Sequence, residues 1–159
     1  MAYAILRTDR VDYPEMRTVR VPKGKQLENG AIVKLGALEG RPEGGEVYAA
    51  DELTNEKGDV YALIAHDGHK YDDREDERDF VAKEETLVRA YLLKRGEIYT
   101  ISKKAHISGE VAKNDILEPK ATSYQLQKCA TPADGTNLVA KVLEITTWAG
   151  QESVVIEII

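Results

Sequence analysis

The residues best suited to metal chemistry lie between His66 and Asp79, in the stretch HDGHKYDDREDERD. His66 and His69 stand three residues apart, and six carboxylates follow within the eight residues from Asp72 to Asp79. Two histidines at this spacing could share an ion on one helical face, but Asp67-Gly68 is a turn signal that interrupts such a face. The spacing of a calcium-binding loop is also missing. We interpret the stretch as a solvated acidic loop, with an ion site as the alternative.

Nucleophilic chemistry has two candidates, Cys129 and His106. A lone cysteine in an apolar strand pattern is more often a small core residue than a nucleophile, and the sequence contains no G-x-S-x-G elbow. His106 could act as a base only beside a nucleophile, so we interpret it as structural. The glycines between Gly36 and Gly45 lack the endings of phosphate-binding loops. We therefore expect no enzyme, with no catalytic residue, no metal ligand and no cofactor.

Composition excludes several classes of partner. The 159 residues are 42% hydrophobic, which is enough for a real core, and the formal net charge is -6 without a cluster of basic residues. Phosphate backbones would repel such a chain, so we expect no nucleic acid partner. The longest apolar runs, Met1 to Leu6 and Val60 to Ala65, are far shorter than the roughly 20 residues of a spanning helix, so we expect no membrane partner.

The ends and the cysteine content predict the compartment. Charges begin at Arg7, before the apolar core of a secretory signal could be completed, so export through a signal peptide is not expected. The single cysteine excludes an internal disulfide and fits synthesis in a reducing cytoplasm.

Short segments that alternate between apolar and polar residues predict the elements that position these side chains. Turn signals such as Glu28-Asn29-Gly30 and Ala133-Asp134-Gly135 separate them. This spacing predicts a mainly β fold, a compact antiparallel β-barrel or sandwich with short hairpins. The predicted strands are Thr18–Val21, Ala31–Leu35, Glu46–Ala49, Val60–Ala65, Thr86–Leu93, Ile98–Ser102, Ser123–Lys128, Leu138–Thr146 and Ser153–Ile158.

The segment from Glu84 to Lys94 fits two periods, because its apolar residues match both helical spacing and strict alternation. We favour a strand. The turn Lys94-Arg95-Gly96-Glu97 is followed at once by Ile98 to Ile101, which predicts that the two flanking strands form a hairpin.

The first 17 residues differ from the rest. Asp9, Asp12 and Pro14 interrupt regular structure, so we expect residues 1–17 to form an extended N-terminal arm that is ordered by lying on another surface. Residues 18–159 would then form the β-rich domain, either as one unit or as two subdomains that meet near residues 110–119.

Three segments carry a resemblance to a known family. They are Thr18 to Leu35 with the following Glu46-Val47-Tyr48 strand, Leu87 to Ser102, and the closing segment NLVAKVLEITTWAGQESVVIEII from Asn137 to Ile159. Together they resemble the small head proteins of tailed bacteriophages that decorate the outside of the capsid.

The resemblance implies a structural virion protein that binds the assembled major capsid protein and stabilises the head. It implies a place on the capsid surface and a homotrimer at local threefold positions as one arrangement. On this hypothesis the arm and the adjoining strand contact the capsid. The expected apolar anchors are Tyr3, Ile5 and Leu6, and the residues expected to meet carboxylates of the shell are Arg7, Arg10, Arg17 and Arg20.

Three alternatives remain open at this point. One is a β-barrel module that binds a small molecule or a glycan, with Trp148 and several tyrosines at its mouth. Another is a metal enzyme that uses His66, His69 and the neighbouring carboxylates. The last is a different virion part, such as a head fibre base or a tail subunit.

Overall fold

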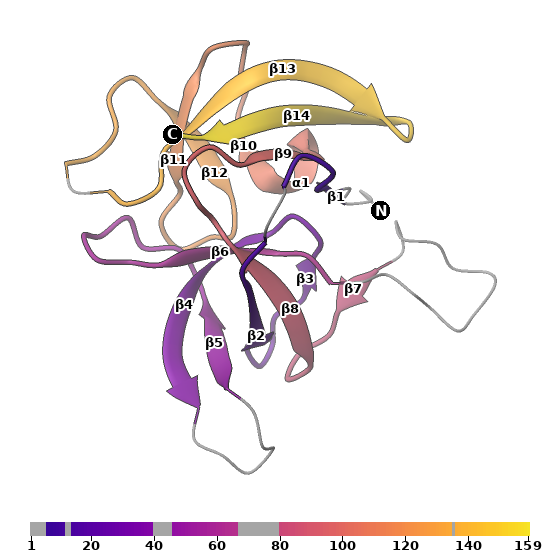
Figure 1. Ribbon diagram of the computed structural model, residues 1–159, viewed down its shortest axis with the longest axis vertical. Helices are drawn as coiled ribbons and strands as arrows, with labels where there is room; N and C mark the ends of the chain where they lie inside the picture. Colours follow the sequence, from indigo (N-terminus) through magenta and orange to yellow (C-terminus); the bar gives the residue numbers. More distant parts are fainter. Residues whose placement is uncertain (1–5, 12–13, 40–45, 67–79, 135) are drawn as a thin grey trace.

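A computed structural model describes residues 6–11, 14–39, 46–66, 80–134 and 136–159. The fold is mainly β, as predicted (Figure 1). Each of the nine predicted strands overlaps a strand of the structure, although most bounds differ by a few residues. The structure also contains short elements that the sequence did not indicate, namely β1 (Leu6–Arg7), β3 (Leu27–Glu28), β7 (Val81–Ala82), α1 (Lys103–His106), β10 (Ile107–Ser108) and β11 (Ile116–Pro119).

Five strands close into a barrel that occupies the lower half of Figure 1. Their order around the barrel is β2 (Met16–Arg20), β5 (Val47–Asp51), β4 (Ile32–Glu39), β6 (Tyr61–Ile64) and β8 (Leu87–Leu92). The pair β2 and β5 is parallel, and the other pairs are antiparallel. A closed ring leaves none of its strands with an unpaired edge.

A seven-stranded sheet forms the upper half of the molecule. Its order is β1, β9 (Ile98–Ser102), β14 (Gln151–Ile158), β13 (Ala140–Trp148), β11, β12 (Leu126–Cys129) and β10. The strands β13 and β14 form a long hairpin that arches over the rest of the protein (Figure 1).

Two hydrophobic clusters explain why the barrel and the sheet hold together. One fills the barrel and includes Val19, Val33 and Ala62. The other lies between barrel and sheet, where Ile32 and Leu63 meet residues of β9, β11, β13 and β14. Because successive side chains of a strand point to opposite faces, β4 and β6 contribute to both clusters in turn.

The ambiguous segment from Glu84 to Lys94 is a strand, as predicted. Val88 and Ala90 of β8 are both buried in the barrel cluster. Their spacing of two residues is the alternation that favoured a strand. Tyr91 lies on the opposite face and packs against the cluster between barrel and sheet.

The predicted hairpin of β8 and β9 is wrong. β8 pairs with β2 and β6 in the barrel, whereas β9 pairs with β14 and β1 in the sheet. The turn itself forms, with Gly96 at a φ of 93°, but the Gly96 N–H donates to the carbonyl of Ile158 and the Ile158 N–H donates to Glu97. The turn therefore passes the chain from one sheet to the other.

This crossing places the change from barrel to sheet between β8 and β9. Residues 110–119, the expected meeting point of two subdomains, lie within the sheet and include β11. Met16 and Arg17, the last two residues of the expected arm, already belong to the barrel strand β2.

Candidate functional site

The described part of the N-terminal arm lies on the protein's own sheet. Leu6 pairs with Ile101 and Arg7 pairs with Thr100, so β1 extends the sheet beyond β9. The half-buried Leu6 side chain packs against the cluster between barrel and sheet. Tyr3 and Ile5 lie outside the described residues.

Arg7 links the arm to the hairpin. Its guanidinium forms two parallel hydrogen bonds with the Asp9 carboxylate, from Nε to Oδ1 and from Nη2 to Oδ2, each 2.7 Å long. The hydrogen bond from Arg7 is the main reason that the pKa of Asp9 is lowered. The same guanidinium lies 4.5 Å from the centre of the Trp148 ring, within the range of a cation–π contact.

Trp148 ends β13 at the tip of the long hairpin, and 42% of its surface is exposed. Ala149 and Gly150 follow with φ values of 48° and 78°, the conformation of a tight two-residue hairpin turn. Ile145 on the same strand is also exposed. The Arg7 guanidinium and the Trp148 ring thus lie together where the arm meets the hairpin tip, whereas Ile145, three residues before Trp148 on the same strand, faces the other side of the sheet.

Two of the other arginines expected at the site, Arg17 and Arg20, do not join this surface, whereas the pKa of Asp9, lowered mainly by the hydrogen bond from Arg7, is lowered further by the charge of Arg10. Arg17 and Arg20 belong to β2 of the barrel, while Arg10 is exposed after β1. The Arg20 Nε lies 2.8 Å from the Glu39 carboxylate, and its Nη1 donates to the carbonyl of Glu85. The Arg17 Nη1 donates to the Met16 carbonyl. The predicted set is therefore divided between sheet and barrel, and several of its charges are used within the protein.

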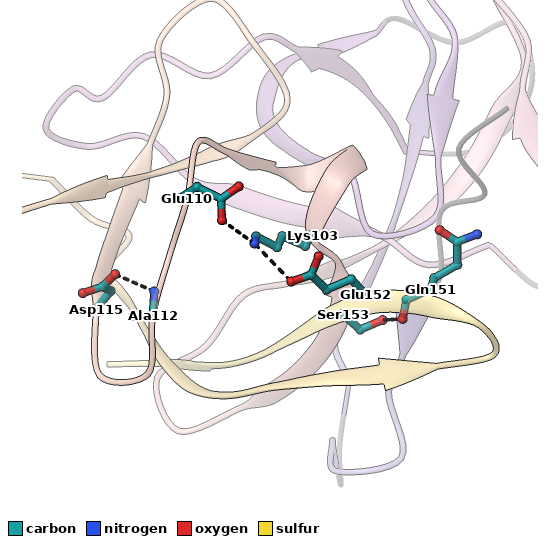
Figure 2. Close-up of polar contacts among 7 residues, drawn as sticks. All are labelled: Lys103, Glu110, Ala112, Asp115, Gln151, Glu152 and Ser153. Carbon is teal, nitrogen blue, oxygen red and sulfur yellow. Dashed lines mark hydrogen bonds and ion pairs between the residues drawn. The ribbon is translucent and has the colours of Figure 1, made fainter.

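The hairpin is braced near its tip by Lys103, which lies at the start of α1 (Figure 2). Its ammonium lies 2.6 Å from a Glu110 oxygen and 3.1 Å from a Glu152 oxygen, and only 13% of its side chain is exposed. The hydrogen bond with Glu110, followed by that with Glu152, raises the pKa of Lys103. The lysine thus connects α1, the segment after β10 and the strand β14.

The Asp115 carboxylate braces the neighbouring loop, which joins β10 to β11. Asp115 accepts a hydrogen bond of 2.7 Å from the Ala112 N–H, which Figure 2 also shows, and pairs with Lys128 at 2.9 Å. The bond from Ala112 and then the bond from Lys128 lower the pKa of Asp115. These contacts fix the loop between β10 and β11 against β12, so they are structural.

Of the residues considered for catalysis or metal binding, the structure describes Cys129, His66 and His106. The Cys129 thiol donates a hydrogen bond of 3.7 Å to the Ile116 carbonyl, and burial raises its pKa, so it stays protonated. The ring of His66 stacks on Phe80 with centroids 5.1 Å apart. In the described ranges no three histidine, cysteine or acidic side chains are close enough to hold a metal ion. His69 and the residues from Asp72 to Asp79 lie outside them, so the ion site stays untested.

His106 is buried in the interior of the protein. It is 2% exposed, and its Nε2 lies 2.8 Å from the Asn29 carbonyl oxygen. Because a carbonyl can only accept a hydrogen bond, Nε2 carries the proton. Burial lowers the pKa of His106 to about 4, although the bond to Asn29 opposes this. The ring is therefore neutral at physiological pH.

His106 also lines a cavity of about 700 Å³ that the sequence did not indicate. Its walls come from β3, β7, α1 and the segment from Thr122 to Gln125. Glu28 is the polar residue of greatest interest there, because among the described residues nothing forms a hydrogen bond or an ion pair with its carboxylate. Trp148, which was expected at the mouth of a ligand site, lies on the hairpin and not in this cavity.

No family model, no curated protein and no solved structure matches the chain. Over its described residues, the structure contains no helix that combines the length and the apolar character needed to cross a membrane.

Proposed function

We propose that the protein is a structural component of a phage head, which binds the outside of the capsid lattice through the major capsid protein and stabilises the head. The observation that carries the proposal is the contact between Arg7 and Trp148, which unites the arm and the hairpin tip into one exposed surface. The resemblance of three sequence segments to capsid decoration proteins supports the same role.

The proposed contact surface is centred on Arg7 of β1 and Trp148 at the hairpin tip. Arg7 is already neutralised by Asp9, so pairing with shell carboxylates is a smaller part of its role than its sequence suggested. Trp148 supplies a large, rigid ring with a polar N–H, a combination that is common among residues that dominate binding energy at protein interfaces. We therefore propose Trp148 as the main anchor.

Stabilisation of the head follows from mass action. A protein that binds the expanded lattice more tightly than the precursor lattice favours the expanded form, by as much as its difference in affinity. A stiff scaffold limits the entropy lost on binding. The closed barrel and the braces at Lys103 and Asp115 supply that stiffness.

Replacing Trp148 with serine is expected to weaken capsid binding about 30-fold, because removal of a central aromatic anchor typically costs about 2 kcal/mol. Binding is measured by co-sedimentation with purified heads over a range of protein concentrations. Leu38→Ser is the matched control. Leu38 is more exposed than Trp148, at 53%, but it is next to last in β4, whose end lies far from the hairpin (Figure 1).

Equal binding by the Trp148 and Leu38 variants would refute the proposed contact surface. Deletion of residues 1–11 provides a second test, because it removes β1 and leaves the barrel strand β2 intact. This truncated protein is expected to bind heads more weakly than the full chain. Undiminished binding would show that the arm has no part in the contact.

A further inference from the structure

The cavity beside His106 is a preformed part of the fold. The backbone of Ile32 donates to the Tyr124 carbonyl, and Leu53 exchanges hydrogen bonds with Thr122 and Ser123, so the segment that forms one wall is held on the barrel. The Gln125 side chain donates to the Ala105 carbonyl and fixes this wall to α1. A rigid cavity of this size is in the range of small-molecule sites.

Glu28 gives the cavity an uncompensated negative charge. Its side chain is half-buried, and within the described part of the chain no group forms a hydrogen bond or an ion pair with its carboxylate. Burial is what raises the pKa of Glu28. A carboxylate that is removed from water without a partner lowers stability, and such a cost is typically kept where a ligand supplies the missing partner.

The lysines that line the cavity do not supply this partner. Lys25 pairs with Glu52 at 2.7 Å, and Lys104 is exposed. Neither lysine forms a hydrogen bond or an ion pair with the Glu28 carboxylate within the described part of the chain.

One further group can accept a hydrogen bond at the same cavity. The Nδ1 of His106 is left as an acceptor, because Nε2 donates to the Asn29 carbonyl. Leu27, Ala31, Val81 and Ala105 add apolar surface to the walls. Among the described residues, the lining thus combines one carboxylate without a partner and an apolar surround.

We propose that this cavity binds a small organic cation, an ammonium or guanidinium group on a short apolar chain, with the Glu28 carboxylate as its counter-ion. The apolar chain would lie against Leu27, Val81 and Ala105. This site is separate from the arm and the hairpin tip, so it does not depend on the proposed capsid contact.

The test is a titration of the ¹⁵N-labelled full chain with n-pentylamine and with agmatine, followed through the backbone amide signals of Ala105 and Gln125. We expect saturable shifts of these signals with at least one of the two cations. The neutral n-pentanol and the anionic pentanoate are expected to bind at least about tenfold more weakly, because they cannot pair with Glu28. No saturable shift with either cation, or equal binding of pentanol, would overturn the proposal.

Two variants test whether the bound cation pairs with the carboxylate of Glu28. Glu28→Gln keeps the size of the side chain and is expected to weaken binding of the cation about tenfold or more. Glu144→Gln is the matched control, because Glu144 is exposed on β13 and does not line the cavity. The amide spectrum of each variant reports whether it is folded. Unchanged binding by the folded Glu28 variant would also overturn the proposal.

Discussion

Substitution of Gly30 by alanine is expected to lower the free energy of unfolding by about 3 kcal/mol, through backbone strain and a steric clash that act together. Gly30 has a φ of 92°, which residues with a Cβ rarely adopt. An added Cβ would lie 2.8 Å from the Nε2 of His106 and 2.9 Å from its Cδ2. The new methyl group would therefore displace the ring that is hydrogen-bonded to Asn29.

Gly58→Ala separates these two contributions. Gly58 has the same φ of 92°, but an added Cβ there meets nothing within 4 Å. We expect this variant to lose about 1 kcal/mol from strain alone. Urea unfolding curves of both variants at neutral pH measure the difference. Equal losses at the two positions would show that the close packing of Gly30 on His106 does not contribute to stability.

Acidification is expected to destabilise the protein by about 3 kcal/mol between pH 6.5 and pH 4 through His106 alone. Burial lowers the pKa of His106 from 6.5 in the unfolded chain to about 4 in the folded protein. Above pH 6.5 neither state binds the proton, so this contribution is constant. Between the two values only the unfolded state binds it, and stability falls as the pH falls. Below pH 4 both states are protonated and the loss ends.

His106→Gln removes this titration and keeps a side chain that can donate to the Asn29 carbonyl. The free energy of unfolding of the variant should change less than that of the unaltered protein over the same pH range. Carboxyl groups such as Asp115, whose pKa is lowered, add their own losses near and below pH 4 in both proteins. Parallel pH profiles for the two proteins would contradict the assignment to His106.

The strands were predictable because alternation depends on local sequence. Val88 and Ala90 alternate with exposed residues, so their period identified β8 even though helical spacing was also possible. Alternation specifies the buried face and not the pairing partner. The hairpin of β8 and β9 was predicted wrongly for this reason, since Ile98 to Ser102 fits equally well beside β14.

The candidate sites were less predictable, because they depend on contacts between distant segments. Glu28, His106 and Tyr124 line one cavity, although they are far apart in the chain and lie in β3, in α1 and in the loop before β12. The sequence marked Glu28 only as the start of a turn. Arg7 was proposed from the sequence as a surface residue, but its contact with Trp148 bridges the two ends of the chain and required the folded structure.

The most direct test of the central claim is co-sedimentation of the unaltered protein with tailed-phage heads in the expanded and the precursor form. The account predicts saturable binding to expanded heads, with a fixed ratio of copies to major capsid protein and weaker binding to precursor shells. Absence of saturable binding to expanded heads would contradict it.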